Sequence, residues 1–183
     1  MPITIRPARL ADCVTIGEIH VAAWRETYAS LMPQQLLDEL SAAARAAMWR
    51  QALERDPPIP ALFVAAAESG EVVGFAAGGP WRGAPQKADG EIYAIYVLQA
   101  AQRRGAGRML MAAVAAALDT HVLRSLGLWV LRANRSARSF YGELGGSVIG
   151  ERIEVMDGRD LTELAYGWSD MTALLTPRPG RGG

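Results

Sequence analysis

One segment limits the choice of fold more than any other, because a strand-like run, a glycine-bearing loop and a helical run follow one another directly. The run EIYAIYV occupies residues 91–97, the loop QRRGAG residues 102–107, and the run GRMLMAAVAAAL residues 107–118. β-Branched and aromatic residues dominate the first run, whereas apolar residues recur every three to four positions in the last. The segment therefore predicts a strand whose carboxyl end leads through a short loop into the amino terminus of a helix.

The periodicities on either side of this segment predict a mixed sheet flanked by helices. A strand at residues 3–6 precedes a helix that Asp12 is expected to cap and a helical tract over 33–53 that is broken near Ser41. The other expected elements are strands over 61–67 and 72–77, which form a meander with 91–97, a strand over 126–131, a helix over 135–144, and two strands over 147–156 and 161–168. This order indicates an α/β (α+β) fold with a mixed, mostly antiparallel sheet.

Length and composition fit a single domain. The chain has 183 residues, half of them apolar, and shows no internal repeat or shift in composition. We expect one domain over residues 1–170 and a disordered tail over residues 171–183, which ends in TPRPGRGG.

Charge and cysteine content exclude several kinds of partner. The 19 basic and 19 acidic residues cancel, so a broad basic surface for general nucleic-acid binding is not expected. Cys13 is the only cysteine, which rules out an intrachain disulfide and a multi-cysteine metal site. No apolar run reaches the roughly 18 residues of a membrane span, and the first residues do not resemble a signal peptide. We expect a cytoplasmic protein with no metal, no nucleic acid and no membrane contact.

The loop at residues 102–107 has the composition of an anion-binding site. The amino terminus of a helix presents unpaired backbone N–H groups and the positive end of the helix dipole, and glycines let a pyrophosphate approach closely. Arg103, Arg104 and Arg108 add positive charge. The loop matches neither the P-loop pattern G-x-x-x-x-G-K-[ST] nor the dinucleotide pattern G-x-G-x-x-G. We therefore do not expect a nucleotide bound in either of those ways.

Two segments resemble the GNAT superfamily of acyl-CoA-dependent N-acetyltransferases. The segment IYVLQAAQRRGAGRMLM at residues 95–111 resembles the cofactor-binding motif, and LRANRSARSFYGELGG at residues 131–146 resembles the later motif. The opening IRPARLADCVTI and the segment AWRETY at residues 23–28 resemble a bacterial branch. Gln99 stands where the family often has proline, a difference that removes no N–H donor. The resemblance covers roughly residues 3–168.

The resemblance implies that acetyl-CoA is the cosubstrate. It implies that two central strands of the sheet splay apart and that Ile95 and Val97 pair with the pantetheine arm in the gap, like an added strand. A backbone N–H near Ile95 is implied to polarise the thioester carbonyl as an oxyanion donor. The residues implied to hold the CoA pyrophosphate through their backbone are Arg103, Arg104, Gly105, Ala106, Gly107 and Arg108.

Tyr141 and Asn134 lie seven residues apart, about two helical turns, so a helix capped by Asn134 places them on the same side. By resemblance, Tyr141 matches the family tyrosine that hydrogen-bonds the CoA sulfur and can donate a proton. A packed core tyrosine is the alternative. Asn134 is expected to cap the helix and to contact the cofactor arm, although capping alone would explain it.

Glu91 is the only charged residue in the strand 91–97. Strict alternation places it on the same face as Tyr93, Ile95 and Val97. Burial there would raise the pKa of its carboxyl group, which suits a general base that accepts a proton directly or through water. In the alternatives, Glu91 only caps the exposed start of the strand, or ordered water replaces a single base.

Four aromatic residues, Trp24, Tyr28, Trp81 and Tyr93, are predicted to line the acceptor pocket. In a fold of this kind, the first helices and the loop after the third strand lie over the acetyl end. Each of them could equally pack in the core or on the surface. His20 is expected to be packed rather than catalytic.

These residues predict an acetyl-CoA-dependent N-acetyltransferase that acts on the primary amine of a small molecule by direct attack in a ternary complex. Two alternatives stay open: a protein or peptide acceptor, and a non-catalytic acyl-CoA-binding regulatory module. Self-association into a homodimer also stays open. The sequence does not identify the acceptor.

Overall fold

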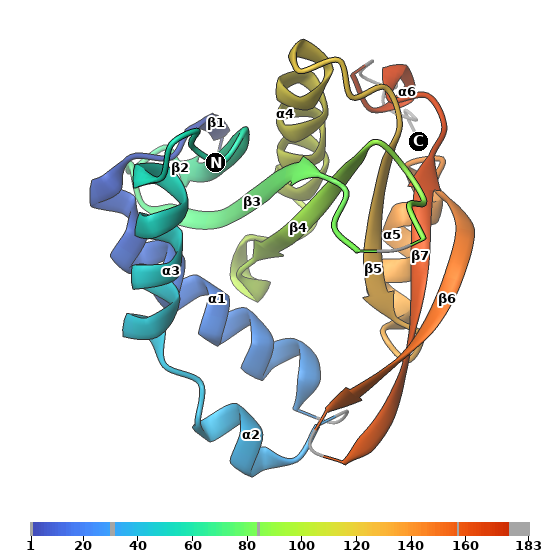
Figure 1. Cartoon of the computed structure of the whole chain (residues 1–183). Coiled ribbons are helices and arrows are strands. Elements are labelled where there is room, and N and C mark those ends of the chain that lie inside the picture. Colours follow the sequence, from blue (N-terminus) through green and yellow to red (C-terminus); the bar gives the residue numbers. More distant parts are fainter. Residues whose placement is uncertain (1, 30–31, 84, 157, 176–183) are drawn as a thin grey trace, which may run out of the picture.

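Seven strands form one mixed sheet in the order β1-β2-β3-β4-β5-β7-β6. The computed structural model describes residues 2–29, 32–83, 85–156 and 158–175 (Figure 1). The elements are β1 (Ile3–Pro7), α1 (Cys13–Tyr28), α2 (Gln34–Asp38), α3 (Ala42–Glu54), β2 (Ala61–Ala67), β3 (Val72–Pro80), β4 (Gly90–Val97), α4 (Ala106–Thr120), β5 (Leu126–Leu131), α5 (Arg135–Glu143), β6 (Ser147–Met156), β7 (Arg159–Trp168) and α6 (Thr172–Leu175). Neighbouring strands are antiparallel, except for the parallel pair β4 and β5. The predicted fold class and element order are confirmed.

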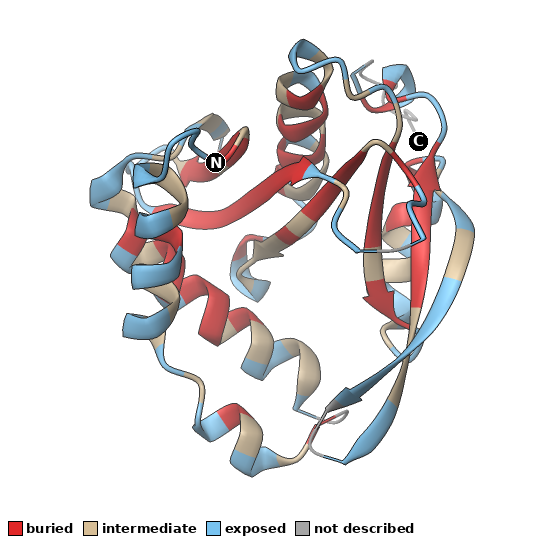
Figure 2. Ribbon diagram, viewed as in Figure 1, coloured by how far each residue is buried: buried red, intermediate tan, exposed pale blue. Residues whose placement is uncertain are grey.

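Helices cover the sheet on two faces, and each face has its own apolar core. On one face, Leu110, Met111 and Val114 of α4 are fully buried in a cluster that extends to β5, α5 and β7. On the other face, Ile16 of α1 and Phe75 of β3 are fully buried in a second cluster. The strands between the helices are accordingly coloured as buried along most of their length (Figure 2). The apolar periodicity of α4 follows from this burial, because an amphipathic helix directs one stripe toward the core.

The helical tract after α1 breaks where the sequence predicts. Ser41 caps α3, since its Oγ accepts a hydrogen bond from Ala44 N at 3.2 Å. The predicted cap of α1 by Asp12 is wrong: its carboxylate instead binds the Arg6 guanidinium at 2.7 and 2.8 Å and accepts from Arg9 N at 2.7 Å. An ion pair with the neighbouring strand competes successfully for the capping oxygen.

The packed part of the chain extends past the predicted boundary at residue 170. Met171 and Leu174 are buried and join the cluster under α4, against which α6 packs. Residues 171–175, which were predicted to belong to a disordered tail, are therefore part of the fold, because two of their apolar side chains are buried in the core. Residues 176–183 lie outside the described part of the chain.

A third, smaller apolar cluster connects the helices α1 and α2 to the half of the sheet that contains β5 and β7. Met32, Leu37 of α2 and Leu131 of β5 are buried together, and Tyr28 and Leu161 pack against them. The long β6–β7 hairpin comes down beside α2 at this point (Figure 1). The cluster thus joins the first helices to the far half of the sheet.

His20 is packed inside the α1 face, as predicted. Its ring stacks on Tyr96 with 5.0 Å between ring centroids, and its Nδ1 accepts a hydrogen bond from Trp49 Nε1 at 3.3 Å. Burial, assisted by the positive charge of Arg45, lowers the pKa of His20 from 6.5 to about 4. The imidazole is therefore neutral at physiological pH.

We expect this buried imidazole to make folding pH-dependent. The unfolded chain binds a proton at His20 near pH 6.5, whereas the folded chain does so only near pH 4. The free energy of unfolding should therefore fall as the pH drops through this window, by about 2–3 kcal/mol. Urea unfolding at several pH values measures it. His20→Gln should lose this share of the slope, and a control, His121→Gln at the exposed end of α4, should keep it. An unchanged slope in His20→Gln would contradict the assignment.

Candidate active site

The parallel strands β4 and β5 separate after two residue pairs. Gly90 pairs with Leu126 and Glu91 with Gly127, and the pairing ends there. Beyond this point the two strands diverge (Figure 1). The splayed central strands that the resemblance implies are thus present, and most of β4 has an open edge in the middle of the sheet.

Ile95 and Val97 direct backbone groups to this open edge. The N–H of Leu98 donates to the carbonyl oxygen of Val73 on β3 at 3.0 Å. Because backbone groups point alternately to the two edges of a strand, those of Val97 and Ile95 point away from β3 and toward the gap. The Val97 carbonyl accepts a hydrogen bond from Gln102 Nε2 at 3.0 Å. The amides of Ile95 and Val97 are therefore placed to pair with an extended ligand.

A β-bulge interrupts β4 at Tyr93. Ala94 lies opposite Ala77 of β3, and Ile92 lies opposite Gly78, so Tyr93 has no residue of its own opposite it. Such an extra residue bends the strand and re-aims the side chains beside it. The bulge therefore divides β4 into two parts with different side-chain orientations.

The bulge changes the face on which Glu91 lies. Ile92, Ile95 and Val97 all pack on the α4 side, although strict alternation would separate Ile92 from the other two. Tyr93 packs on the α1 side. Glu91, next to Ile92, consequently shares the α1 side with Tyr93. The prediction that Glu91 shares a face with Ile95 and Val97 is wrong, because alternation cannot be continued across a bulge.

The Glu91 carboxylate is buried and held at both oxygens by one residue. Its Oε2 accepts from the Arg82 backbone N–H and its Oε1 from Arg82 Nη2, each at 2.8 Å. The side chain of Glu91 is 5% exposed and that of Arg82 is 60% exposed. The same guanidinium lies over the ring of Tyr93, 3.8 Å from its centroid, while the Tyr93 hydroxyl donates to the Pro80 carbonyl at 2.7 Å. Glu91 is thus an ordered anion beside the bulge, not a strand cap.

The glycine-bearing loop forms a concave turn before α4. Arg103 and Gly105 both have positive φ, at 58° and 85°, and α4 begins directly afterwards at Ala106. Alternating backbone conformations of this kind turn successive N–H groups toward one point, where an anion can bind. We call this segment, which carries Arg103, Arg104 and Arg108, the arginine loop. Among the described residues, none of these three arginines forms an ion pair with a carboxylate. Their charges are therefore available to a ligand.

Gly107 is glycine because α5 packs closely against the first turn of α4. A Cβ atom there would lie 3.1 Å from the ring of Phe140 on α5, which is tighter than an ordinary contact. The absence of a side chain lets α5 approach the first turn of α4. The loop and the later helix are consequently held together.

Asn134 and Tyr141 occupy the two positions on α5 that the sequence indicates. Asn134 caps the helix, since its Oδ1 accepts from Ala137 N at 3.1 Å, and Tyr141 is buried beside Tyr166 with 5.9 Å between ring centroids. Burial, reinforced by the neighbouring phenol of Tyr96, raises the pKa of Tyr141 above its usual range. The hydroxyl of Tyr141 therefore keeps its proton at neutral pH.

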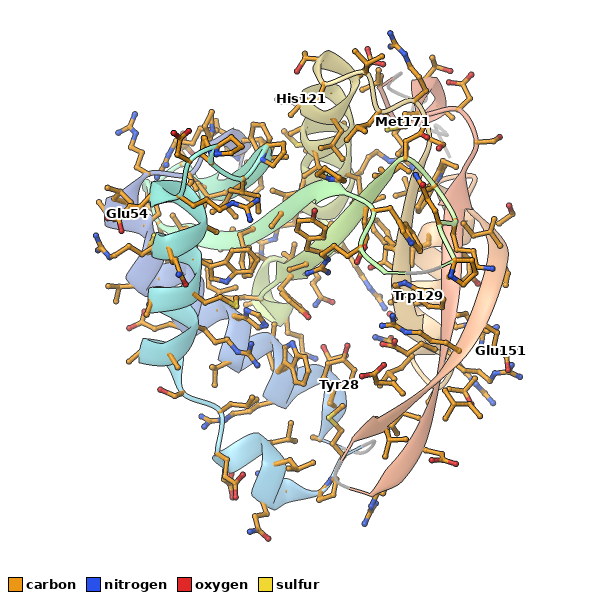
Figure 3. The ribbon with its side chains drawn as sticks, in the orientation of Figure 1. Tyr28, Glu54, His121, Trp129, Glu151 and Met171 are labelled. Carbon is orange, nitrogen blue, oxygen red and sulfur yellow. The ribbon has the colours of Figure 1, made fainter. Side chains whose placement is uncertain are left out.

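The predicted pocket residues lie in two groups on the α1 side. Trp24 donates through Nε1 to the Tyr96 hydroxyl at 2.7 Å and contacts the Tyr28 ring edge-on, with 5.0 Å between centroids. Trp81 instead contacts Trp129 of β5, with 5.9 Å between centroids. Tyr28 at the end of α1 and Trp129 on β5 lie apart from each other in Figure 3. Burial raises the pKa of Tyr96 to about 12.

Sequence analysis missed several polar and aromatic residues on this face. Arg152 binds Glu163 Oε2 through Nε at 2.7 Å and through Nη2 at 2.6 Å, and its guanidinium lies over Trp129, 4.2 Å from the ring centroid. One signal was available, because Glu163 interrupts the apolar alternation of Leu161 and Ala165 along β7. Tyr96 was hidden in an apolar run.

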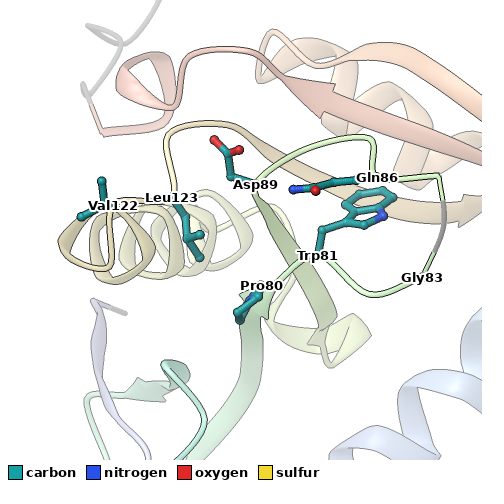
Figure 4. A pocket seen from close by; sticks show the side chains of 7 residues that line it. All are labelled: Pro80, Trp81, Gly83, Gln86, Asp89, Val122 and Leu123. Carbon is teal, nitrogen blue, oxygen red and sulfur yellow. The ribbon is translucent and has the colours of Figure 1, made fainter.

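A cavity of about 410 Å³ lies elsewhere, between the β3–β4 loop and the end of α4 (Figure 4). Trp81, Asp89 and Val122 are among its lining residues. Asp89 already accepts hydrogen bonds from the N–H groups of Arg124 and Ser125, both at 3.0 Å. The cavity adjoins the start of β4, whereas the glycine-bearing loop follows the end of this strand, so the cavity and the loop are separate.

The described residues include no group of three or more His, Cys, Asp and Glu side chains arranged to hold a metal ion. None of their helices combines the length and apolar character needed to cross a membrane.

Comparison with known proteins identifies the family to which this sheet with its separated β4 and β5 belongs. The acetyltransferase (GNAT) family matches residues 18–145. The chain belongs to this family. It is 37% identical over 174 residues to the uncharacterized N-acetyltransferase YuaI of Bacillus subtilis (strain 168), covering 95% of this chain and 97% of YuaI. This GNAT protein is therefore an N-acetyltransferase with acetyl-CoA as its acetyl donor.

Solved structures share the fold. An N-acetyltransferase from Staphylococcus aureus Mu50 superposes with a TM-score of 0.72 at 22% identity, covering 93% of this chain and 99% of that one. YncA from Salmonella typhimurium, solved with its cofactor acetyl-CoA, gives a TM-score of 0.68 at 23% identity, covering 100% and 99%. The GNAT fold is thus matched over nearly the whole length of the chain.

We expect Gly105→Ala to weaken acetyl-CoA binding roughly tenfold, because a side chain at φ 85° costs about 1–2 kcal/mol and displaces the loop. The control is Gly70→Ala in the β2–β3 turn, where φ is 86° and nothing surrounds the new methyl group. Calorimetric titration with acetyl-CoA and urea unfolding of both variants provide the measurements. Both should lose similar stability, and only Gly105→Ala should lose affinity. Equal affinities would count against the loop.

Proposed function

We propose that this N-acetyltransferase transfers acetyl to the primary amine of a small molecule by direct attack in a ternary complex. The observation that carries the proposal is the common location of three features: the open edge of β4, the arginine loop at its end, and the buried phenol of Tyr141. The loop suits a pyrophosphate and the edge suits an amide-bearing arm. Acetyl-CoA contains both groups in this order.

The backbone of this chain supplies the binding and the oxyanion donor in the proposal. The N–H groups from Arg103 to Arg108 hold the pyrophosphate, and the amides of Ile95 and Val97 pair with the pantetheine arm. Asn134 contacts the arm with the part of its side chain that capping leaves free. A backbone N–H near Ile95, just after the bulge, donates to the thioester carbonyl oxygen, where negative charge develops during attack.

Tyr141 supplies the proton for the departing thiolate. A group with a raised pKa holds its proton at neutral pH, so Tyr141 acts as a general acid and not as a base. Its ring is fixed by Tyr166 and Trp168, which form the surrounding wall. Because the ring is buried and packed on two sides, the location of its hydroxyl is fixed.

Glu91 receives the proton of the attacking amine through water. An alkylamine with a pKa of about 10.4 needs about 4.6 kcal/mol to become neutral at pH 7, so a proton acceptor lowers a large part of the barrier. Both oxygens of Glu91 already accept hydrogen bonds from Arg82, which favours a relay over direct contact. The side chains of Trp24, Tyr28, Trp81 and Tyr93 line the path of the acceptor.

Enclosure of the α1 side favours a small acceptor over a protein. The cluster of Leu37, Leu131 and Leu161 connects α2 to β5 and β7. It crosses the face along which an extended peptide would have to lie beside the bulge. A small amine needs less space.

The direct test is binding of acetyl-CoA by calorimetry, followed by thiol release with amines, amino acids, aminoglycosides and peptides. We expect micromolar to millimolar binding and turnover with a small primary amine. Binding without turnover of any compound would support a non-catalytic acyl-CoA-binding module instead. Turnover of peptides alone would indicate a protein or peptide acceptor.

Tyr141→Phe should lower kcat about a hundredfold or more, because the thiolate loses its proton donor, while the affinity for acetyl-CoA changes little. The matched control is Tyr166→Phe, which removes the hydroxyl from the neighbouring buried ring. Steady-state kinetics and calorimetric titration measure the two quantities. Loss of affinity with unchanged kcat would assign Tyr141 to structure.

A further inference from the structure

Glu163 stands out because one of its carboxylate oxygens is unused. Arg152 binds Oε2 twice, and among the described residues no hydrogen bond reaches Oε1. The side chain is 17% exposed. In Glu91, by contrast, both oxygens are occupied. Glu163 therefore has acceptor capacity left for a ligand.

Strand pairing places Glu163 on the proposed acceptor face. It lies opposite Leu131 of β5 and opposite Arg152 of β6, and directly opposed residues of neighbouring strands share a face. Leu131 belongs to the apolar cluster with Tyr28, and Arg152 covers Trp129. Glu163 thus lies between the two groups of aromatic side chains. Its charge also contributes to the raised pKa values of Tyr28 and Tyr96, which places it near both phenols.

Glu163 shares its ion-pair partner with a second carboxylate. Arg152 is shared between Glu163 and Glu154, whose Oε2 lies 3.8 Å from Arg152 Nε. One guanidinium therefore balances two carboxylates. An additional cation at Oε1 would neutralise this cluster.

The position of Glu163 is offset from the bulge along the strands. Glu163 is level with Leu131, four residues after Gly127 and so about 13 Å along β5, whereas Tyr93 lies two residues, or about 7 Å, after Glu91 on β4. Glu163 is therefore offset from the bulge by about 6–7 Å along the strands, and the divergence of β4 and β5 separates the two further. An amine that contacts Glu163 is therefore a different group from the amine that attacks the thioester beside the bulge.

We infer that Glu163 binds a second cationic group of the acceptor, a group that stays charged while another amine of the same molecule is acetylated. A carboxylate stabilises an ammonium ion, which cannot attack, so Glu163 suits the non-reacting group. The preferred acceptors are then diamines and related dications. This inference rests on the proposed function and narrows its substrate class.

The test compares diaminobutane, with an amine at each end, with butylamine, which lacks the second charge. We expect wild-type kcat/KM to favour the diamine roughly tenfold to a hundredfold, mainly through KM, as for one hydrogen bond to a charged group. In Glu163→Gln this ratio should fall toward one. In the control Glu151→Gln, an exposed carboxylate paired with Arg132, the ratio should stay as in the wild type.

Every outcome decides between the two claims. A wild-type enzyme that turns over both amines equally, or a preference that survives in Glu163→Gln, overturns the inference and leaves the proposed function standing. Equal losses of kcat/KM for both amines in Glu163→Gln also overturn the inference, because the preference for the diamine would then be unchanged. Acetyl-CoA titration of the variant shows whether such a loss comes from misfolding. Glu91→Gln should slow both amines alike. If the wild type acetylates no amine, the proposed function fails and the inference fails with it.

Discussion

The early end of the pairing between β4 and β5 is the constraint on which the rest of the structure depends. Unpaired backbone groups inside a protein must find partners, so an open edge in mid-sheet is unfavourable unless a ligand or water occupies it. Here the edge starts after Glu91 and leads to the loop that ends at Gly105. Tyr141 of α5 is buried in the apolar cluster that also contains Ile92 of β4. In the proposed mechanism, the same break provides the donor site, and α5 supplies the acid.

Local signals in the sequence predicted most of the fold, and they also suggested the residues of the proposed donor site. The apolar repeat of α4, the cap at Asn134 and the break at Ser41 each depend on residues within a few positions of one another. The arginine loop depends on neighbours in the same way. Ile95 and Val97 share one face of β4, as alternation predicts, because no irregularity lies between them.

Features that depend on distant parts of the chain were not predictable. The extra residue at Tyr93 appears only when β4 is aligned with β3, and it reverses the side chains that alternation would assign. Asp12 is drawn from its capping position by Arg6 of the adjacent strand. Glu163 meets Arg152 only because β6 and β7 pair in one particular register. The proposed acceptor side contains several such long-range pairs, which is why sequence analysis did not find Tyr96, Trp129, Arg152 and Glu163.

The small cluster of Met32, Leu37, Leu131 and Leu161 gives the split sheet a second point of attachment. Two half-sheets joined only by the short pairing of β4 and β5 can move apart, whereas a second contact at the opposite end fixes the distance between them. The spacing between the half-sheets then depends on the side-chain volume within this cluster. Evolution could retune which acyl chain or amine fits by exchanging leucines there, without altering any group that takes part in the chemistry.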